Sequence, residues 1–271
     1  MRAQPRASRK KPRNTRRKLV ARRRVPSLVS SSAIDQRAAS ACADIDAGPA
    51  AATHRAQPLV DVSCRTLDIV GSALMLLLLA PVLAAIAIAI RLDSPGPAIF
   101  RQRRVGRGRR PFTVMKFRTM HQGVAHDPHR EFVIGLIKGE TPQLDTESEE
   151  TPGLYFKMIG DKRVTRVGRL LRRSSLDELP QLWNVLRGEM SLVGPRPPIP
   201  YEVEHYPPHW FARFNVKPGV TGLWQVSGRS QVTLEEMVRL DVDYASRRSL
   251  RLNLWILART VPAVLGARGA W

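Results

Sequence analysis

The chain has 271 residues, enough for one large domain or two small ones, and 43% of them are hydrophobic, which suffices to bury a core. Lys and Arg number 44 against 23 Asp and Glu, so the net charge is +21 and the expected partner is polyanionic: nucleic acid, anionic lipid or a phosphorylated substrate. The two cysteines exclude a disulfide framework, and no C-x-x-C pair is present to hold zinc. Together they favour a reducing, cytosol-facing location.

The N-terminal segment carries about half of the excess charge. Residues 1–24 contain twelve Lys and Arg and no acid, and residues 1–60 as a whole mix these with Ala, Ser and Pro without any apolar period. Such a composition buries too little apolar surface to offset the entropy of ordering. It predicts a disordered basic tail over 1–60 that lies on anionic lipid, and a transit peptide is the alternative.

A long apolar segment follows. Residues 69–90 are 22 consecutive uncharged residues, and a helix of about 20 crosses a bilayer core. Pro81 removes a backbone donor, so the helix should kink or break there. Arg65 precedes the segment, and Arg91 and a run of arginines follow it, so positive charge on both sides opposes a straight span. We therefore predict a re-entrant membrane helix over 61–95, with an ordinary kinked span as the alternative.

The remaining residues, 96–271, are predicted to form one cytosolic domain at the membrane interface. Two short strands, 98–102 and 111–117, flank a Gly/Arg turn, and the acidic stretch 121–160 reads as a solvated loop. The prolines within 193–208 predict extended or turning chain. Helical spacing of apolar residues predicts helices at 164–171, 176–186, 232–244 and 250–265. The fold class is therefore α+β, mainly helical.

The densest polar cluster lies at 172–181. Ser175 and Glu178 match the capping box S-x-x-E, which makes Asp177 an ordinary acid of a first helical turn. Alternatively the helix starts at Pro180, and Asp177 and Glu178 face its positive end. In either arrangement Asp177 stays ionised beside two arginines, and such a carboxylate is a competent nucleophile toward phosphorus.

Several other side chains are suited to phosphate, metal or sugar. The cationic candidates are Lys116, Arg118, Arg196 and Arg229. Asp241 and Asp243 could reach a metal or a sugar hydroxyl, or pair with Arg239 and Arg247. The chain has no P-loop and no G-x-S-x-G. The histidines at 121, 126 and 129 lack the compact helical spacing of a metal site.

Four separated strings closely resemble the bacterial sugar transferase family, the monotopic phosphoglycosyl transferases. The resemblance covers about residues 61–265. The strings are GPAIFRQRRVGRGRRPFTVMKFRTM (96–120), DKRVTRVGRLLRRSSLDELPQLWNVLRGEMSLVGPRPP (161–198), KPGVTGLWQVSGR (217–229) and DVDYASRRSL (241–250).

This resemblance implies an inner-membrane enzyme with a re-entrant helix and a cytoplasm-facing catalytic domain. It further implies transfer of a sugar phosphate from a UDP-sugar to polyprenyl phosphate, with release of UMP. The family's essential Asp-Glu pair falls on Asp177 and Glu178, which are expected to hold Mg²⁺, and Asp177 is expected to form a covalent phosphosugar intermediate. Arg172, Arg196 and Arg229 fall on positions associated with phosphate or nucleotide. Membrane lipids are expected partners, nucleic acid is not, and homodimer formation is left open.

The residues support the covalent route separately. A phosphate monoester with a second pKa of about 6 is already an anionic nucleophile at neutral pH and needs no general base. With Asp177 as nucleophile, the direct reaction between two anions, the UDP-sugar and polyprenyl phosphate, is replaced by two steps in which fewer negative charges meet at once. Two departures from the family stand out. Ala80 precedes Pro81 where a Ser-Pro pair is common, and Asn253 stands where an Asp is common.

Two rival functions remain at this point. One is a basic membrane-associated protein that binds nucleic acid or regulates without catalysis, through the tail and the arginine run. The other is an inactive scaffold for glycosyltransferases, which the intact Asp177, Glu178 and Arg196 disfavour. Trp210, Phe211 and Phe214 are read as interfacial aromatics or, alternatively, as core.

Overall fold

The computed structural model describes residues 58–121, 128–138, 163–227 and 233–265. In chain order the elements are α2 (Pro58–Asp93), β1 (Ile99–Val105), η2 (Arg107–Arg109), β2 (Pro111–Phe117), α3 (Pro128–Ile137), α4 (Arg166–Ser174), η3 (Leu176–Glu178), α5 (Gln181–Arg187), β3 (Ser191–Val193), α6 (Pro200–Val203), η4 (Pro208–Asn215), β4 (Gly219–Thr221), α7 (Leu223–Ser227), α8 (Leu234–Arg247) and α9 (Leu250–Leu265). Helices dominate and the strands are short, so the mainly helical α+β class is confirmed.

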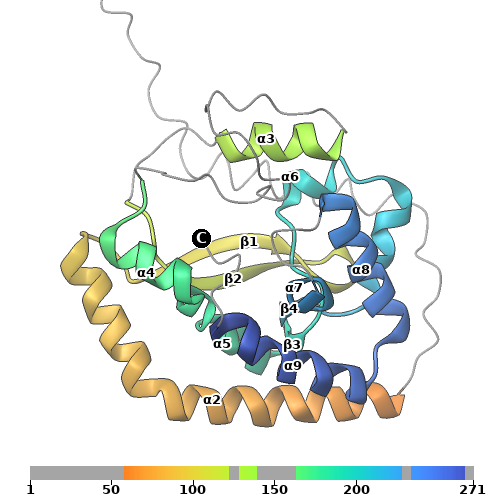
Figure 1. Ribbon diagram of the computed structural model, residues 1–271, viewed down its shortest axis with the longest axis horizontal. Helices are drawn as coiled ribbons and strands as arrows, with labels where there is room; N and C mark the ends of the chain where they lie inside the picture. The colour runs from red at the N-terminus through yellow and green to blue at the C-terminus, as the bar shows by residue number, and fades with distance from the viewer. Residues whose placement is uncertain (1–57, 122–127, 139–162, 228–232, 266–271) are drawn as a thin grey trace, which may run out of the picture.

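Helix α2 runs beneath the rest of the molecule and bends upward beside α4 (Figure 1). It is a continuous helix of 36 residues, and Pro81 lies inside it. Proline removes one helical hydrogen bond and is a common cause of such a bend, so the helix is bent without being interrupted. In the described part of the chain, α2 is the one helix long and apolar enough to cross a membrane.

One stripe of α2 is attached to the domain above it. Cys64, Asp68 and Ser72, spaced by four residues and so lying on one helix face, are buried. The Asp68 carboxylate accepts hydrogen bonds from Ser191 Oγ at 2.9 Å and from Leu192 N at 2.8 Å, both in β3. The rest of the helix surface is largely exposed and apolar.

Further contacts fasten α2 near both of its ends. Close to the start, Arg65 donates to the carbonyl oxygens of Val185 and Leu186, in the last turn of α5, at 2.7 and 2.8 Å. At the end, Asp93 Oδ2 accepts from Val167 N of α4 at 3.1 Å. The two ends of α2 therefore contact the same domain.

The first hairpin is held against α5. Strands β1 and β2 pair antiparallel from Ile99↔Phe117 to Val105↔Pro111. Asn184 of α5 is buried, and its amide nitrogen donates to Thr113 O at 2.7 Å while its amide oxygen accepts from Met115 N at 3.0 Å. These bonds use backbone groups of β2 that the hairpin leaves unpaired, so α5 lies in a fixed position relative to β2.

A second, parallel pair joins β3 to β4, which sequence patterning did not predict. The register is Ser191↔Gly219 and Val193↔Thr221. The backbones approach closely, because a Cβ atom on Gly219 would lie 2.0 Å from Gly194 N. Three-residue strands are too short to give a period-2 signal, which explains why they were missed.

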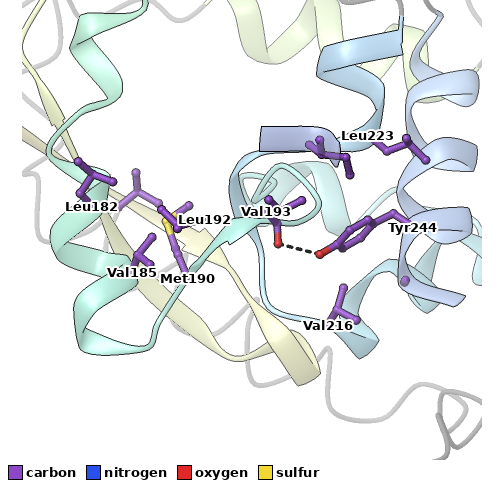
Figure 2. Packing of buried hydrophobic residues seen from close by; sticks show 11 residues of the cluster. Leu182, Val185, Met190, Leu192, Val193, Val216, Leu223 and Tyr244 are labelled. Atoms are coloured by element: carbon purple, nitrogen blue, oxygen red, sulfur yellow. Dashed lines mark hydrogen bonds between the residues drawn. The ribbon is translucent and has the colours of Figure 1, made fainter. Parts of the chain in front are cut away.

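The main core lies between α5, β3 and the C-terminal helices (Figure 2). Its labelled members are Leu182, Val185, Met190, Leu192, Val193, Val216, Leu223 and Tyr244. The single hydroxyl proton of Tyr244 has two acceptors within reach, Val193 O at 2.9 Å and Asn253 Oδ1 at 2.8 Å. Asn253 Nδ2 in turn contacts Cys64 Sγ at 3.3 Å. The amide at position 253 therefore links α9 to α8 and α2.

Several expectations need correction. The interpretation of Trp210 and Phe214 as interfacial aromatics is wrong, because both are buried in a second core cluster around η4 and α8. The stretch 121–160 is not all loop, because residues 128–137 form α3. β1 extends to Val105, past the expected end at 102. The predicted tail, 1–60, ends too late, because residues 58–60 already belong to α2. Its residues 1–57 and the acidic cluster around 145–150 lie outside the described residues.

Candidate active site

Asp177 and Glu178 lie on a tight turn between two helices. Helix α4 ends at Ser174, and Ser175 adopts a left-handed conformation with φ 57°, which reverses the chain direction. The single 3₁₀ turn Leu176–Glu178 follows, and α5 begins after Pro180. The Ser175 side chain makes no capping hydrogen bond. The capping-box interpretation is therefore wrong, and a helix start next to Pro180 is confirmed.

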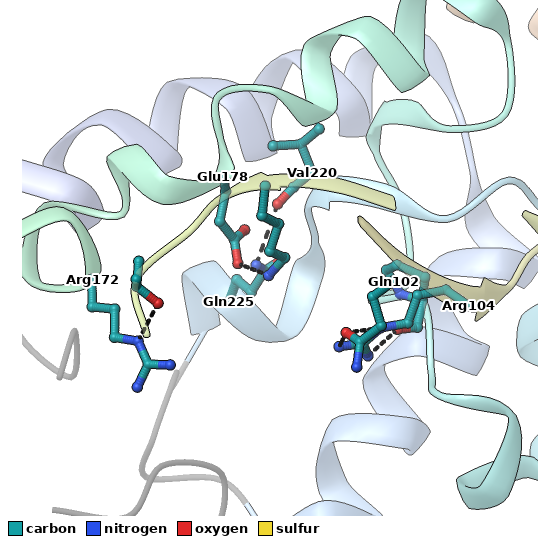
Figure 3. Close-up of polar contacts among 9 residues, drawn as sticks. Gln102, Arg104, Arg172, Glu178, Val220 and Gln225 are labelled. Carbon is teal, nitrogen blue, oxygen red and sulfur yellow. Dashed lines mark hydrogen bonds and ion pairs between the residues drawn. The ribbon is translucent and has the colours of Figure 1, made fainter. Parts of the chain in front are cut away.

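Glu178 is paired with a lysine of the hairpin. Lys116 Nζ lies 2.8 Å from Glu178 Oε1, and both side chains are partly exposed (Figure 3). The contact arises because Asn184 fixes α5, and with it the preceding turn, next to β2. Lys116 therefore contacts one of the two carboxylates, and its predicted contact with phosphate stays a prediction. Asp177, the other, is half-buried on the same turn.

The proline-rich loop at 194–198 is held by two buried arginines. Arg104 of β1 donates from Nη1 to Pro197 O at 2.8 Å. Arg213 of η4 donates from Nη2 to Arg196 O at 2.9 Å. Prolines on either side of Arg196 restrict the backbone further. The guanidinium of Arg196 therefore projects from a backbone that has little freedom to move.

Arg213 is in turn held by Asp241 of α8. Its Nη2 lies 2.5 Å from Asp241 Oδ2, and its Nη1 donates to Tyr206 OH at 3.1 Å. Both charged side chains are 1% exposed. Burial raises the pKa of Asp241 to about 6, against the opposing effect of the Arg213 charge, so the carboxylate is ionised at neutral pH. This contact takes the place of the substrate contact predicted for Asp241.

Charges from separate elements act on Arg104. Burial, followed by the positive charge of Arg196, lowers the pKa of Arg104 to about 10, while Glu202 and Glu178 act in the opposite direction. The Arg104 guanidinium also donates from Nε and Nη2 to Gln102 Oε1 at 3.0 and 2.7 Å (Figure 3). The charges that affect the pKa of Arg104 thus come from η3, α6 and the proline-rich loop. Of the two arginines, Arg196 has the partly exposed guanidinium that is suited to a polyphosphate.

The sequence profile of the bacterial sugar transferases matches residues 60–267. The chain belongs to the bacterial sugar transferase family. It is 42% identical over 220 residues to a UDP-glucose:undecaprenyl-phosphate glucose-1-phosphate transferase of Caulobacter vibrioides, covering 78% of this chain and 73% of that one. It is 35% identical over 219 residues to the exopolysaccharide production protein ExoY of Rhizobium meliloti, covering 81% and 92%. A UDP-galactose-lipid carrier transferase of Erwinia amylovora is 42% identical over 207 residues, which are 76% of this chain and 41% of that protein.

Other predicted site residues of this sugar transferase are dispersed. Arg118 is buried and donates to the carbonyl oxygens of Pro95 and Ser94 at 2.6 and 2.7 Å, so it holds the loop after α2 and does not face open surface. Arg172 Nε donates to Thr119 Oγ1 at 3.0 Å (Figure 3). Asp243 pairs with Arg247 on the exposed side of α8, as the more ordinary interpretation expected. Arg229 lies outside the described residues.

Two arginines that sequence reasoning missed prove central to the geometry of the sugar transferase. Arg104 was grouped with the basic run that follows the membrane segment, although a polar residue at an inward strand position predicts a buried contact. Arg213 stands among the aromatics of the second core cluster, and its carboxylate partner lies 28 residues downstream. An arginine within an apolar stretch predicts a buried ion pair, but its partner cannot be read from sequence spacing.

A metal site can be assessed from the donor atoms. In the described ranges no group of three or more His, Cys, Asp or Glu side chains is placed to hold a metal ion. Mg²⁺ commonly takes one or two carboxylates and completes its shell with water and substrate phosphates. Asp177 and Glu178 fit that donor set, with Glu178 sharing its carboxylate with Lys116. The predicted magnesium site stays a prediction.

Proposed function

We propose that this sugar transferase moves a sugar 1-phosphate from a UDP-sugar to polyprenyl phosphate, releases UMP, and so starts synthesis of an exopolysaccharide or another glycan. The activities for which the Caulobacter and Erwinia relatives are named support both substrates. The structural observation that carries the proposal is the Asp177–Glu178 turn, where Glu178 contacts Lys116 and lies within electrostatic range of Arg104, whose pKa is also affected by Arg196.

The reaction proceeds in two displacements at one phosphorus atom. An Asp177 carboxylate oxygen attacks the β-phosphorus of the UDP-sugar, the bond to the bridging oxygen breaks, and UMP leaves with that electron pair. A phosphate oxygen of the polyprenyl phosphate then attacks the same phosphorus, and the Asp177 oxygen leaves. The products are UMP and a polyprenyl diphosphate sugar, and no proton transfer is required because the acceptor is already anionic.

The surrounding side chains bind and orient the anions. Arg196, on its rigid loop, and Arg104 supply fixed positive charge that needs no rearrangement during the reaction. Lys116 holds Glu178 in place until substrate binds. A magnesium ion on Asp177 and Glu178, when bound, would neutralise phosphate charge.

The attachment of α2 supports a re-entrant arrangement in the cytoplasmic membrane. A straight helix of 36 residues is about 54 Å long, and a transmembrane span would place its ends on opposite sides of a core of about 30 Å. Here Arg65 near the start and Asp93 at the end contact the same domain. A bent helix that enters and leaves one leaflet satisfies both contacts and keeps the active site at headgroup level, on the cytoplasmic side.

The covalent route is tested with donor alone. Purified enzyme mixed with UDP-sugar and no acceptor should release about one UMP per active site as a burst. Asp177→Asn should abolish the burst while retaining thermal stability and partition into membrane. Glu235→Gln removes an exposed carboxylate of α8 and should leave the burst intact. Wild-type enzyme that requires both substrates for any UMP release would establish direct transfer.

Topology is tested by labelling. With the native cysteines replaced, single cysteines at Leu59 and Leu92, which are 85% and 83% exposed, should react with an impermeant maleimide from the same side of sealed vesicles. Labelling from opposite sides would contradict the re-entrant helix.

The nucleic-acid-binding alternative is not favoured. The family match covers residues 60–267, and the relatives of Caulobacter and Erwinia are named for transfer from sugar donors to lipid carriers. The excess positive charge is accounted for by phosphate-bearing substrates and lipid.

A further inference from the structure

We propose that the junction between the end of α2 and the start of β1 is a binding site for the headgroup of an anionic phospholipid, separate from the catalytic site. An open pocket of about 370 Å³ lies at this junction. Its lining residues are Ala87, Ile88, Arg91, Pro97, Ala98, Ile99 and Arg101.

The pocket combines the two chemistries of a phospholipid. Arg91 and Arg101, one from each element, are exposed, and in the described part of the chain neither has a carboxylate within ion-pair distance. Two guanidiniums converging on one pocket suit a phosphodiester. On the side of α2, the pocket is lined by Ala87 and by Ile88, which is 60% exposed. This apolar helix surface provides a path for an acyl chain.

The pocket wall is preformed. Arg118 holds the loop that joins α2 to β1 through hydrogen bonds to Ser94 and Pro95. Ile90, next to Arg91 in the helix, packs with Phe117 of the hairpin in a small core cluster. The two arginines are therefore presented by elements that already hold their positions, which lowers the entropy lost on binding.

The pocket and the catalytic site are separate because successive side chains of a strand point to opposite faces of the hairpin. Ile99 and Arg101 have side chains on one face of the hairpin, and Phe100 points to the other. Lys116, which pairs with Glu178, is the cross-strand partner of Phe100 and shares its face. The pocket residues therefore lie on the hairpin face opposite to Lys116, and this separation from Glu178 favours a bilayer phospholipid over the reacting acceptor as the occupant.

Lipid retention tests the proposal. Full-length enzyme from nanodiscs with equal amounts of phosphatidylcholine and phosphatidylglycerol is extracted into mild detergent, and retained lipid is counted by native mass spectrometry. Wild type should retain phosphatidylglycerol preferentially. Each arginine near an anionic surface contributes about fivefold to lipid affinity, so Arg91→Gln/Arg101→Gln should lower the ratio of the two lipids by about 25-fold.

Matched variants and a competitor decide the interpretation. Arg91→Lys/Arg101→Lys keeps the charge and should retain the lipid, and Arg239→Gln, which removes an exposed arginine of α8, should match wild type. An unchanged lipid ratio in the double Gln variant overturns the proposal. So does displacement of phosphatidylglycerol by equimolar polyprenyl phosphate, because the pocket would then belong to the acceptor. Retention is measured without turnover, so it does not depend on the proposed reaction.

Discussion

The buried pair of Arg213 and Asp241 offers a way to separate stability from the positioning of Arg196. Arg213→Met removes the cation and leaves the Asp241 carboxylate, 1% exposed, without its partner. Breaking a buried pair in this way costs about 3–5 kcal/mol of unfolding free energy. The double variant Arg213→Met/Asp241→Leu removes the stranded charge, and apolar replacement of a buried pair is often nearly neutral. The double variant should therefore recover most of the stability that the single variant loses.

Activity should not recover with stability. In both variants Arg196 O loses the donor at 2.9 Å that fixes its loop. A displacement of about 1 Å in a substrate-positioning group costs about 100-fold, so kcat/KM for the UDP-sugar should fall by that factor in the single and the double variant alike. The assays are thermal unfolding in detergent and steady-state UMP release. If the double variant regained activity together with stability, the pair would serve the fold alone, and the positioning of Arg196 would be refuted.

Three other predictions follow from the same contacts. Gly168→Ala would place a Cβ 2.2 Å from Thr119 O, so the Tm should fall, with overpacking costing about 1–3 kcal/mol or more. Asp68→Ala leaves two donors of β3 without an acceptor at about 1–3 kcal/mol each, and Asp68→Asn, which keeps one oxygen, should lose less in the same melting assay. The pKa of Asp241 is raised from 3.8 to about 6, so proton uptake by this group stabilises the native state as the pH falls from about 6 to 4. The UMP burst should nevertheless decline over the same pH range, because Arg213 loses its counterion. A burst that does not change with pH would contradict this prediction.

Local patterns predicted much of the fold. The apolar run predicted α2, turn residues separated the strands of the hairpin, and α9 has the bounds that its apolar spacing indicated. These elements carry their signal within a few residues. The parallel pair of β3 and β4 depends on a close approach of two glycines 25 positions apart, Gly194 and Gly219, which no local period encodes.

In the candidate site too, features with a local sequence signal were predicted, and contacts between distant residues were not. Asp177 and Glu178 were predicted as site residues because they are adjacent in a dense polar cluster and match the Asp-Glu pair of the family that the sequence resembles. The pairing of Lys116 with Glu178 and of Arg213 with Asp241 spans 62 and 28 residues. Burial also decides roles that residue type alone leaves open. Arg118 and Arg196 are both arginines near prolines. The Arg118 guanidinium donates to a backbone carbonyl oxygen, whereas at Arg196 it is the backbone carbonyl oxygen that accepts a hydrogen bond, from Arg213.

The attachment of α2 has a consequence for how the chain is made. Asp68 leaves the ribosome 123 and 124 residues ahead of Ser191 and Leu192, the groups that satisfy its carboxylate. At about 5–20 residues per second, that interval lasts about 6–25 s. During it α2 is already available to the bilayer with an unsatisfied acid on one face. The hydrogen bonds that attach this helix to the domain therefore form only after β3 has been synthesised.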